Sequence, residues 1–285
     1  MKSHLWIEEK HKGFLGMSYK VEEVLFSGNS DFQSVDIVRT KGHGKMLLND
    51  GLVMVTERDE FAYHDMISHV PLFVHPNPKN VLIIGGGDGG TAREVLRHPS
   101  VNKCTMVEID AMVVEACKEF IPQTSKDLNH PKMNLIIGDG LEFVKKTNEK
   151  FDLILVDSTD PIGPAQPLFG KGFYQDIFDC LNDNGIVVSQ GESCFYEVKM
   201  QTKLLSILSE LFPVSLIYNF SNLTYPGGLW SFTFASKGLH PLKDFQESRV
   251  NKSGLKFDYY NKDIHKAAFS LPTFMKNNLA PYLKG

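Results

Sequence analysis

The stretch Val81-Leu82-Ile83-Ile84-Gly85-Gly86-Gly87-Asp88-Gly89-Gly90 joins a short apolar run to a loop of five glycines and one acid. The apolar run is too short for most helices and is typical of a buried parallel strand. Residues 91–98 are mostly good helix formers, so the loop is expected at a helix N-terminus, where nucleotide ligands commonly bind. The stretch therefore predicts a strand, a ligand loop and a helix of an open α/β sheet.

Asp88 is an unusual residue for such a loop. A glycine-rich turn built for a phosphate offers backbone N–H groups, whereas an acid at its tip repels a dianion and attracts a cation. The sequence therefore favours a nucleoside that carries positive charge over a pyrophosphate. The alternative for Gly85, Gly86 and Gly87 is a tight turn that needs positive φ angles and binds no ligand.

Strand and helix patterns alternate along the chain after this loop, from residue 103 to residue 211. Repeated βα units indicate a doubly wound parallel sheet with right-handed crossovers. The last two predicted strands, residues 214–220 and 229–235, are joined by a turn too short for a helical crossover, so they must pair antiparallel. A parallel sheet that ends in an antiparallel hairpin resembles the class I methyltransferase architecture, an α/β fold of Rossmann-like type.

The first sixty residues show a different pattern. Residues 19–22 alternate between apolar and polar side chains, and Asn49-Asp50-Gly51 is a hairpin signal, so we expect a small antiparallel β-sheet. Such a sheet buries little by itself and should pack on the larger domain or on another subunit. Helical spacing over residues 59–74 ends in a proline-containing segment. We therefore predict a β-strand domain over 1–60, a helix and linker over 61–78, and a Rossmann-like domain over 79–285.

Composition bounds the class of protein. The 285 residues are 42% hydrophobic and carry a formal net charge of −4, as in an ordinary globular protein. This balance offers no basic footprint and argues against nucleic acid as a partner. No apolar run approaches the roughly 20 residues of a membrane span, so we expect a soluble cytoplasmic protein. The cysteines, which form no CxxC pair, are expected to be reduced thiols: Cys104, Cys117, Cys180 and Cys194.

Acidic residues follow four predicted strands of the parallel sheet: Asp88, Glu108, Asp139 and Asp157. Ligands of such sheets bind at the carboxyl ends of the strands, so these carboxylates are expected to line one edge. Glu108 comes twenty residues after Asp88, near the spacing at which an acid accepts both ribose hydroxyls of a nucleoside. Asp139 is a candidate acceptor for an adenine amino group, and its alternative role is to cap the helix that follows.

Asp157 and Asp160 share one loop, where two carboxylates repel each other unless a cation lies between them or one pKa rises. Either outcome suits an amine substrate. An amine is protonated at neutral pH and must lose a proton to act as a nucleophile, and Asp157 is the candidate base. The long segment 157–171 contains several prolines and glycines and is predicted to cover the site as a lid, with a rigid surface turn as the alternative.

Several other polar residues are candidates by position: Gln33, Tyr63, His64 and Gln190, each of which has packing or capping as an alternative role. The histidines show no metal-ligand spacing such as HExxH, so we predict no metal site. Tyr225 is expected to present its ring to the same edge, where it can attract a sulfonium or an ammonium.

With these residues assembled, the sequence closely resembles the spermidine synthases, the polyamine aminopropyltransferases, over nearly the whole chain. The resemblance implies transfer of an aminopropyl group from decarboxylated S-adenosylmethionine to putrescine. The products are spermidine and methylthioadenosine, and the reaction uses no metal and no permanently bound cofactor. The motifs that carry the likeness occur in order at residues 56–61, 85–95, 108–110, 138–140, 157–165, 224–226 and 263–269.

The resemblance also implies roles for individual residues, with Asp157 as the proton acceptor. The adenosine part would be held by Gln33, Gly85, Gly86, Gly87, Glu108, Asp139, Gly140 and Pro164. The amine and aminopropyl channel would be lined by Tyr63, His64, Asp88, Asp157, Ser158, Thr159, Asp160, Gln190 and Tyr225. The family implies an N-terminal β domain and a homodimer or homotetramer. His64, where eukaryotic members carry Gln, and Leu229-Trp230 resemble the bacterial branch, and they leave the preferred amine open.

Two other functions fit parts of the same pattern. An S-adenosylmethionine-dependent amine N-methyltransferase is the alternative within this fold. A non-catalytic polyamine-binding protein keeps an acidic channel but does not need Asp157, and the presence of Asp157 beside the nucleoside set argues against it. The expected mechanism is a one-step displacement, in which the deprotonated amine attacks the methylene next to the sulfonium and correct positioning supplies much of the rate.

Overall fold

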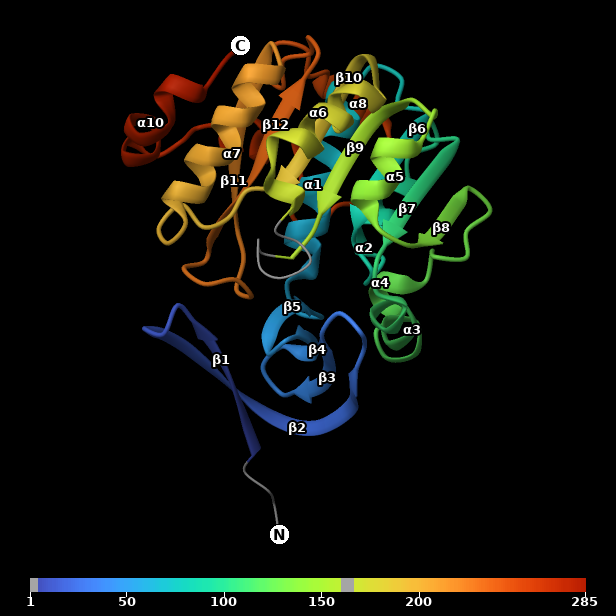
Figure 1. The fold of residues 1–285 in the computed structure, drawn as a ribbon, viewed down its shortest axis with the longest axis vertical. Helices are drawn as coiled ribbons and strands as arrows, with labels where there is room; N and C mark the ends of the chain where they lie inside the picture. Colours follow the sequence, from blue (N-terminus) through green and yellow to red (C-terminus); the bar gives the residue numbers. More distant parts are fainter. Residues whose placement is uncertain (1–4, 160–166) are drawn as a thin grey trace.

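The computed structural model describes residues 5–159 and 167–285 and contains two sheets (Figure 1). The smaller, N-terminal sheet is antiparallel, and its strands follow chain order: β1 (Leu5–His11), β2 (Leu15–Asn29), β3 (Ser34–Thr40), β4 (Gly44–Asn49) and β5 (Leu52–Thr56). Asp50 and Gly51 both have positive φ, as a tight hairpin between β4 and β5 requires. The predicted N-terminal sheet and its hairpin are confirmed.

The larger sheet has the strand order β11-β12-β10-β9-β6-β7-β8. Pairs among β6, β7, β8, β9 and β10 are parallel, whereas β12 pairs antiparallel with both β10 and β11. The predicted parallel sheet with a final antiparallel hairpin is therefore confirmed. Its strands are β6 (Asn80–Gly85), β7 (Lys103–Glu108), β8 (Met133–Ile137), β9 (Phe151–Asp157), β10 (Leu181–Gln190), β11 (Val214–Ser221) and β12 (Leu229–Ser236).

Helices lie between and beside these strands, as repeated βα units require. α1 connects the two sheets, and α2 begins directly after the glycine loop. The helices are α1 (Glu60–Val74), α2 (Gly90–Leu96), α3 (Ala111–Phe120), α4 (Pro122–Ser125), α5 (Gly140–Lys146), α6 (Lys171–Cys180), α7 (Val198–Leu211), α8 (Glu247–Lys252), α9 (Lys262–Ala268) and α10 (Thr273–Leu279), with a final 3-10 turn at Ala280–Tyr282.

Strand β6 shows why both faces of the larger sheet are covered. Val81 and Ile83 pack into the core cluster that contains α1, while Leu82 and Ile84 pack into the cluster that contains α6 and α7. All four side chains are at most 2% exposed. Full burial of such side chains stabilises a fold by about 1.5–3 kcal/mol each. This two-sided burial fixes the position of the loop that follows β6.

The C-terminal segment differs most from the sequence-based expectation. The segment ends in α10 and the 3-10 turn. The short helices α8 and α9 were not predicted. A long-range anchor holds this segment, because Asp65 Oδ2 on α1 accepts the N–H groups of Asp258, Tyr259 and Tyr260. Such an anchor depends on tertiary structure and leaves no local pattern.

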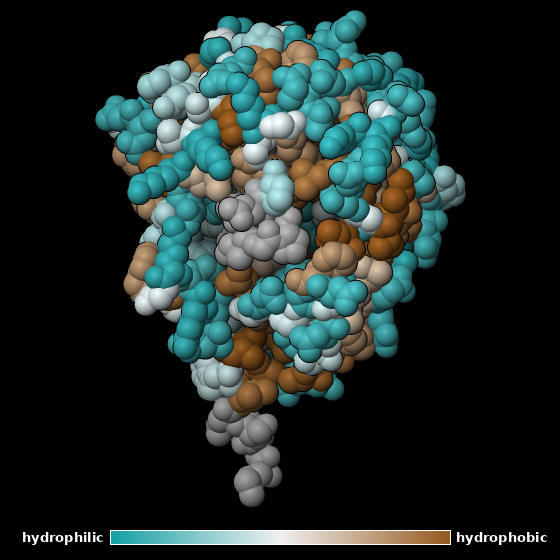
Figure 2. All heavy atoms as spheres, in the orientation of Figure 1, coloured by the Kyte–Doolittle hydropathy of each residue, from teal (hydrophilic) through white to brown (hydrophobic). Residues whose placement is uncertain are grey.

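The surface of the N-terminal sheet is unusually apolar. Leu5, Trp6 and Phe14 on the β1–β2 hairpin are 45%, 56% and 70% exposed, respectively. Hydrophobic residues are visible at the lower end of the face shown in Figure 2, toward the N-terminal sheet. Exposed apolar patches commonly mark protein–protein contacts.

Among the described residues no helix has the length and apolar character needed to cross a membrane. The four cysteines are buried and free, as predicted.

Candidate active site

A cavity of about 240 Å³ lies between the N-terminal sheet and the carboxyl ends of β6, β7 and β9. Most of the candidate residues of both predicted sets line it together. They are Gln33, Tyr63, His64, Gly85, Gly86, Gly87, Asp88, Glu108, Asp139, Gly140, Asp157, Ser158, Thr159, Gln190 and Tyr225. Asp160 and Pro164 lie outside the described residues, together with the rest of segment 160–166 of the predicted lid. The fold thus brings candidates from eight segments of the chain to one place.

The glycine loop approaches the end of β9 closely. Gly85 has a φ of +82°, and a Cβ atom added there would lie 2.2 Å from the main-chain oxygen of Asp157. The Gly86 N–H donates to the same oxygen at 2.9 Å. Glycine is therefore required here for backbone conformation and for strand packing. This structural role is the one the sequence left as an alternative, and it also brings the loop to Asp157.

Glu108, at the end of β7, lies against the loop. Its Oε2 accepts the N–H of Gly87 at 3.1 Å and its Oε1 accepts the N–H of Asp110 at 2.8 Å. Burial raises the pKa of Glu108 to about 7, although these two N–H groups oppose the shift. The carboxyl group is therefore fixed in orientation and faces the cavity beside the glycine loop.

Two further candidates take part in structural contacts near Glu108. Asp139 Oδ1 accepts the N–H of Leu141 and caps α5, so the alternative role predicted for it is present. Gln33, in the turn between β2 and β3, donates from its side-chain amide to Asp110 Oδ2 at 3.0 Å. This bond connects the N-terminal sheet to the first turn of α3. Both residues line the cavity as well.

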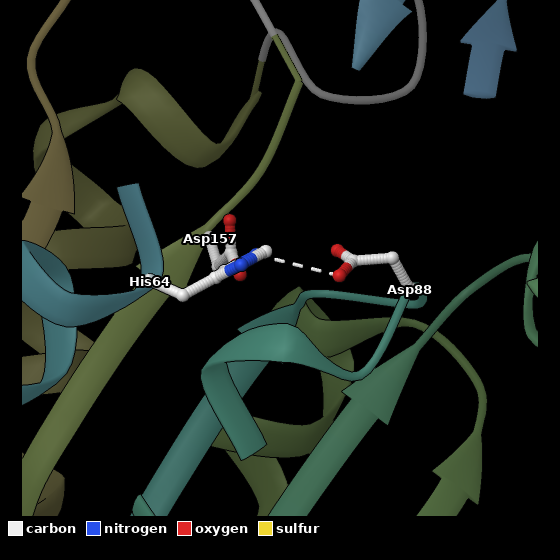
Figure 3. A group of neighbouring side chains, drawn as sticks. All are labelled: His64, Asp88 and Asp157. Carbon is white, nitrogen blue, oxygen red and sulfur yellow. Dashed lines mark ion pairs between the residues drawn. The ribbon is translucent and has the colours of Figure 1, made fainter. Parts of the chain in front are cut away.

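Asp88, His64 and Asp157 converge from the loop after β6, from α1 and from the end of β9 (Figure 3). Asp88 Oδ1 lies 3.3 Å from His64 Nε2 and also accepts the N–H of Gly90. In Figure 3 the His64 ring points toward Asp88, with Asp157 beside it. The charge of Asp88 is therefore partly balanced by His64, which the sequence did not show.

Asp157 has the properties expected of a base. Burial raises its pKa, and the nearby charge of Asp88 raises it further. His64 and a hydrogen bond from Thr91 oppose this rise, and the Thr91 hydroxyl donates to Asp157 Oδ2 at 2.7 Å. A carboxylate with a raised pKa is a better proton acceptor than a solvated one. The arrangement can take a proton from an amine in the cavity.

An aromatic wall leads from Asp157 toward the N-terminal sheet. Tyr63 lies against Tyr225 with ring centroids 5.8 Å apart, and Tyr225 lies 4.8 Å from Trp230. Burial and the charge of Asp157 raise the pKa of Tyr63, so its hydroxyl stays protonated. The Tyr225 hydroxyl donates to the main-chain oxygen of Met54 on β5. These rings form an apolar surface that also attracts cations.

Sequence reasoning missed Glu9 and His11 on β1, which also line the cavity. Glu9 is only 2% exposed, burial raises its pKa, and its Oε1 lies 3.0 Å from His11 Nε2. The available signal was the strand period, since Ile7, Glu9 and His11 fall on one face of β1 while the residues between them are exposed. The mixed charges of this segment obscured that pattern.

Within the described part of the chain, two groups of side chains have atoms close enough to hold a cation: His64 with Asp88 and Asp157, and Asp65 with His69 and Glu94. In the second group, His69 Nε2 lies 3.1 Å from Glu94 and 3.4 Å from Asp65. Histidine must give up a ring proton to bind a metal through that nitrogen, whereas here Nε2 of both His64 and His69 lies within ion-pair distance of carboxylate oxygens. We therefore interpret both groups as ion-pair clusters.

Replacing Thr91 with valine is expected to move the acid limb of the kcat/KM profile to higher pH by about one unit. The Thr91 hydroxyl stabilises the ionised form of Asp157, so its loss raises the pKa of that carboxyl. With Asp157 as the base, activity is expected to fall as pH drops through this pKa. Thr124→Val is the control, because the Thr124 hydroxyl is buried and, among the described contacts, donates only to the main-chain oxygen of Ile121, the residue before α4. If the acid limb lay at the same pH in Thr91→Val and Thr124→Val, the assignment of Asp157 as the base would be contradicted.

Comparisons with known proteins give a consistent result. A family model described as the spermine/spermidine synthase domain matches residues 60–247, and one described as the spermidine synthase tetramerisation domain matches residues 5–57. The polyamine aminopropyltransferase of Alkaliphilus metalliredigens is 47% identical over 96% of this chain and 98% of its own. That of Methanocaldococcus jannaschii is 44% identical over 97% of this chain and 95% of its own.

Solved structures show the same similarity. A crystal structure of spermidine synthase in complex with the transition-state analogue AdoDATO superposes with a TM-score of 0.96 at 44% identity, over 98% of this chain and 96% of that one. The spermidine synthase of Thermotoga maritima superposes with a TM-score of 0.94 at 43% identity, over 98% and 95% of the two chains. Both similarities cover the two sheets and the cavity between them.

Proposed function

Because the chain belongs to the spermine/spermidine synthase family, we propose that it transfers the aminopropyl group of decarboxylated S-adenosylmethionine to putrescine. The products are spermidine and methylthioadenosine. The observation that carries this proposal is the position of Asp157. Its main-chain oxygen accepts the N–H of Gly86 in the glycine loop, and its side chain lies beside His64 and Asp88. A base at that point lies between the nucleoside side and the amine side of one cavity.

The reaction follows from the residues around that base. The attacking nitrogen of putrescine gives a proton to Asp157 and its lone pair forms a bond to the methylene next to the sulfonium. The carbon–sulfur bond breaks, and its electron pair goes to sulfur, which leaves as neutral methylthioadenosine. The Tyr63 and Tyr225 rings and Asp88 line the part of the cavity that holds the two amine-bearing chains. Holding the reactants in line supplies much of the acceleration.

The donor occupies the other side of the cavity in this proposal. Glu108, with its carboxyl group fixed by two N–H groups, accepts hydrogen bonds from the ribose. Asp139 contributes through the oxygen that does not cap α5, and Gln33 closes the site from the N-terminal sheet. The glycines supply close backbone approach: Gly85, Gly86, Gly87 and Gly140. Ser158, Thr159 and Gln190 line the amine side. Asp160 and Pro164, which lie outside the described residues, keep their predicted roles in the amine channel and at the adenosine part, respectively.

We further propose that the chain works as a homodimer or homotetramer, with residues 1–60 as the assembly domain and residues 79–285 as the catalytic domain. The match to a tetramerisation domain over residues 5–57 supports this assembly. The exposed Leu5, Trp6 and Phe14 of the β1–β2 hairpin are suitable contact residues. Free buried thiols are consistent with the cytoplasm as the place of action.

A panel of acceptors tests the proposed amine. Putrescine is expected to exceed butylamine in kcat/KM by about ten- to a hundredfold, because a hydrogen-bonded charge at the second amine is worth roughly 1.5–3 kcal/mol. Initial rates of methylthioadenosine release measure both acceptors with the same donor. Butylamine serves as the matched control, since it has the same carbon chain and lacks only the second ammonium. Equal rates for the two would contradict an acidic clamp on the acceptor.

A further inference from the structure

Glu60 and Arg93 form a buried ion pair directly behind His64. Arg93 Nη1 donates to Glu60 Oε1 at 2.8 Å and Nη2 donates to Oε2 at 2.9 Å. Glu60 Oε2 in turn lies 2.5 Å from His64 Nδ1, one helical turn further along α1. Exposed fractions of the three residues range from 2% to 7%. Neither Glu60 nor Arg93 belongs to the candidate residues predicted from the sequence.

Both ring nitrogens of His64 face a carboxylate. Nδ1 contacts Glu60, and Nε2 lies 3.3 Å from Asp88. A neutral imidazole has one N–H and one lone pair, so it would direct a lone pair at one of the two acids. The imidazolium donates to both and replaces this repulsion with two charge-assisted contacts. The geometry therefore requires the charged form of His64.

The electrostatics agree with that geometry. Burial by itself lowers the pKa of His64, but the charges and hydrogen bonds of Asp88 and Glu60 raise it to about 10. Burial would likewise raise the pKa of Glu60, whereas His64 and Arg93 lower it to about 2. Glu60 therefore remains a carboxylate, and His64 remains an imidazolium, through the neutral range.

The surroundings of the ring hold its orientation. A Cβ atom added at Gly90 would lie 2.2 Å from His64 Cε1, so the ring rests directly on the first residue of α2. The titratable groups around the ring come from every element packed on it. They are Glu60 and Tyr63 from α1, Asp88 from the loop after β6, Arg93 from α2 and Asp157 from β9.

We propose that Glu60, held by Arg93, is a positioning residue that fixes the His64 ring and keeps it as an imidazolium, so that His64 balances Asp88 and leaves Asp157 to take the proton of the amine. The first half of this proposal concerns the protein alone, and the second half rests on the proposed function. Its consequence is an alkaline limit to activity. Because the pKa of His64 in the folded protein is raised to about 10, the imidazolium and the activity that depends on it are lost as pH rises through about 10.

The test compares Glu60→Gln with Asp65→Asn. Asp65 is a matched control because it is equally buried on the same helix, pairs with His69 four residues later and does not line the cavity. Nuclear magnetic resonance of ring-labelled histidines, with His64→Gln for assignment, follows the charge of His64 in the full-length protein. Wild-type His64 is expected to stay charged to about pH 9 or above, one unit below its pKa. In Glu60→Gln it should titrate at least about one unit lower than in the wild type.

The kcat/KM profile with one donor and putrescine gives the second readout. The alkaline limb of Glu60→Gln is expected to fall at lower pH, by the same shift that the resonance shows, while Asp65→Asn keeps the wild-type limb. Putrescine has the same pKa values in every reaction. A difference in the alkaline limb between variants therefore comes from a titrating group of the enzyme. Glu60→Asp, which keeps the carboxylate, should recover part of the shift.

Three results would overturn the proposal: a neutral His64 at pH 7 in the wild type, an unchanged His64 titration in Glu60→Gln, or an equal change in Asp65→Asn. The first needs no variant, so it stands even where Glu60→Gln does not fold. Failure of the proposed function would look different, because the wild type would then transfer no aminopropyl group while the titration of His64 still gave its answer.

Discussion

Replacement of Asp157 by asparagine is expected to lower kcat by about 10²- to 10⁴-fold, the usual effect of losing a general base. The amide keeps the size of the side chain and still accepts the Thr91 hydroxyl through its oxygen. It cannot take the proton of the amine. Donor binding should stay close to that of the wild type, because the nucleoside contacts lie on the other side of the cavity. Steady-state rates and calorimetric titration of the donor measure the two effects separately.

Asp152→Asn is the matched control for this variant. Asp152 lies near the opposite end of the same strand, where its Oδ2 accepts the N–H groups of Lys79 and Asn80, and an amide oxygen can replace it there. Wild-type kcat is expected for this control. Turnover of Asp157→Asn near the wild-type rate at neutral pH would show that another group accepts the proton.

Replacement of Gly85 by alanine is expected to destabilise the fold by about 3 kcal/mol or more. The new Cβ would overlap the main-chain oxygen of Asp157 at 2.2 Å, and the φ of +82° is one that alanine rarely adopts. Neither partner is a flexible side chain end that can move aside. Urea unfolding monitored by circular dichroism should show the loss, and surviving protein should have reduced activity because the Asp157 backbone is displaced.

Gly172→Ala is the control for the effect that any glycine-to-alanine change has on the conformational entropy of the unfolded chain. Gly172 lies in α6, and apart from its chain neighbours and the helix backbone no atom of the described residues lies within 4 Å of a Cβ atom added there. This substitution is expected to leave stability unchanged or to raise it by about 0.4–1 kcal/mol. Similar losses in both variants would mean that the approach of the glycine loop to β9 is not what requires Gly85.

The sequence predicted the scaffold well because its signals are local. The apolar run of β6 and the glycines that end it are adjacent in the chain, and the Asn-Asp-Gly turn marks the β4–β5 hairpin by itself. The short helices α8 and α9 were missed because helices of six or seven residues depend on tertiary contacts more than on propensity. Asp65, which anchors the segment near α9, acts across 193 residues or more.

The candidate site was predicted as a set of residues but not as a network. The strand-end rule placed Asp88, Glu108 and Asp157 at one edge, because it depends only on the order of strands. It gave no information on the pair between Asp88 and His64, whose side chains come from different elements. The strand period places Glu9 on the inner face of β1 but does not show that this face lines the cavity, because that depends on how the N-terminal sheet packs on the larger one.

The identity of the reaction product distinguishes aminopropyl transfer from methyl transfer. The purified protein is incubated with putrescine and either decarboxylated S-adenosylmethionine or S-adenosylmethionine, and the products are identified by mass spectrometry. If the protein transfers the aminopropyl group, the decarboxylated donor gives spermidine and methylthioadenosine. No product is expected from S-adenosylmethionine, because the acids Asp88 and Asp157 repel the carboxylate that this donor carries. Methylated putrescine, or no product from the decarboxylated donor, would contradict aminopropyl transfer.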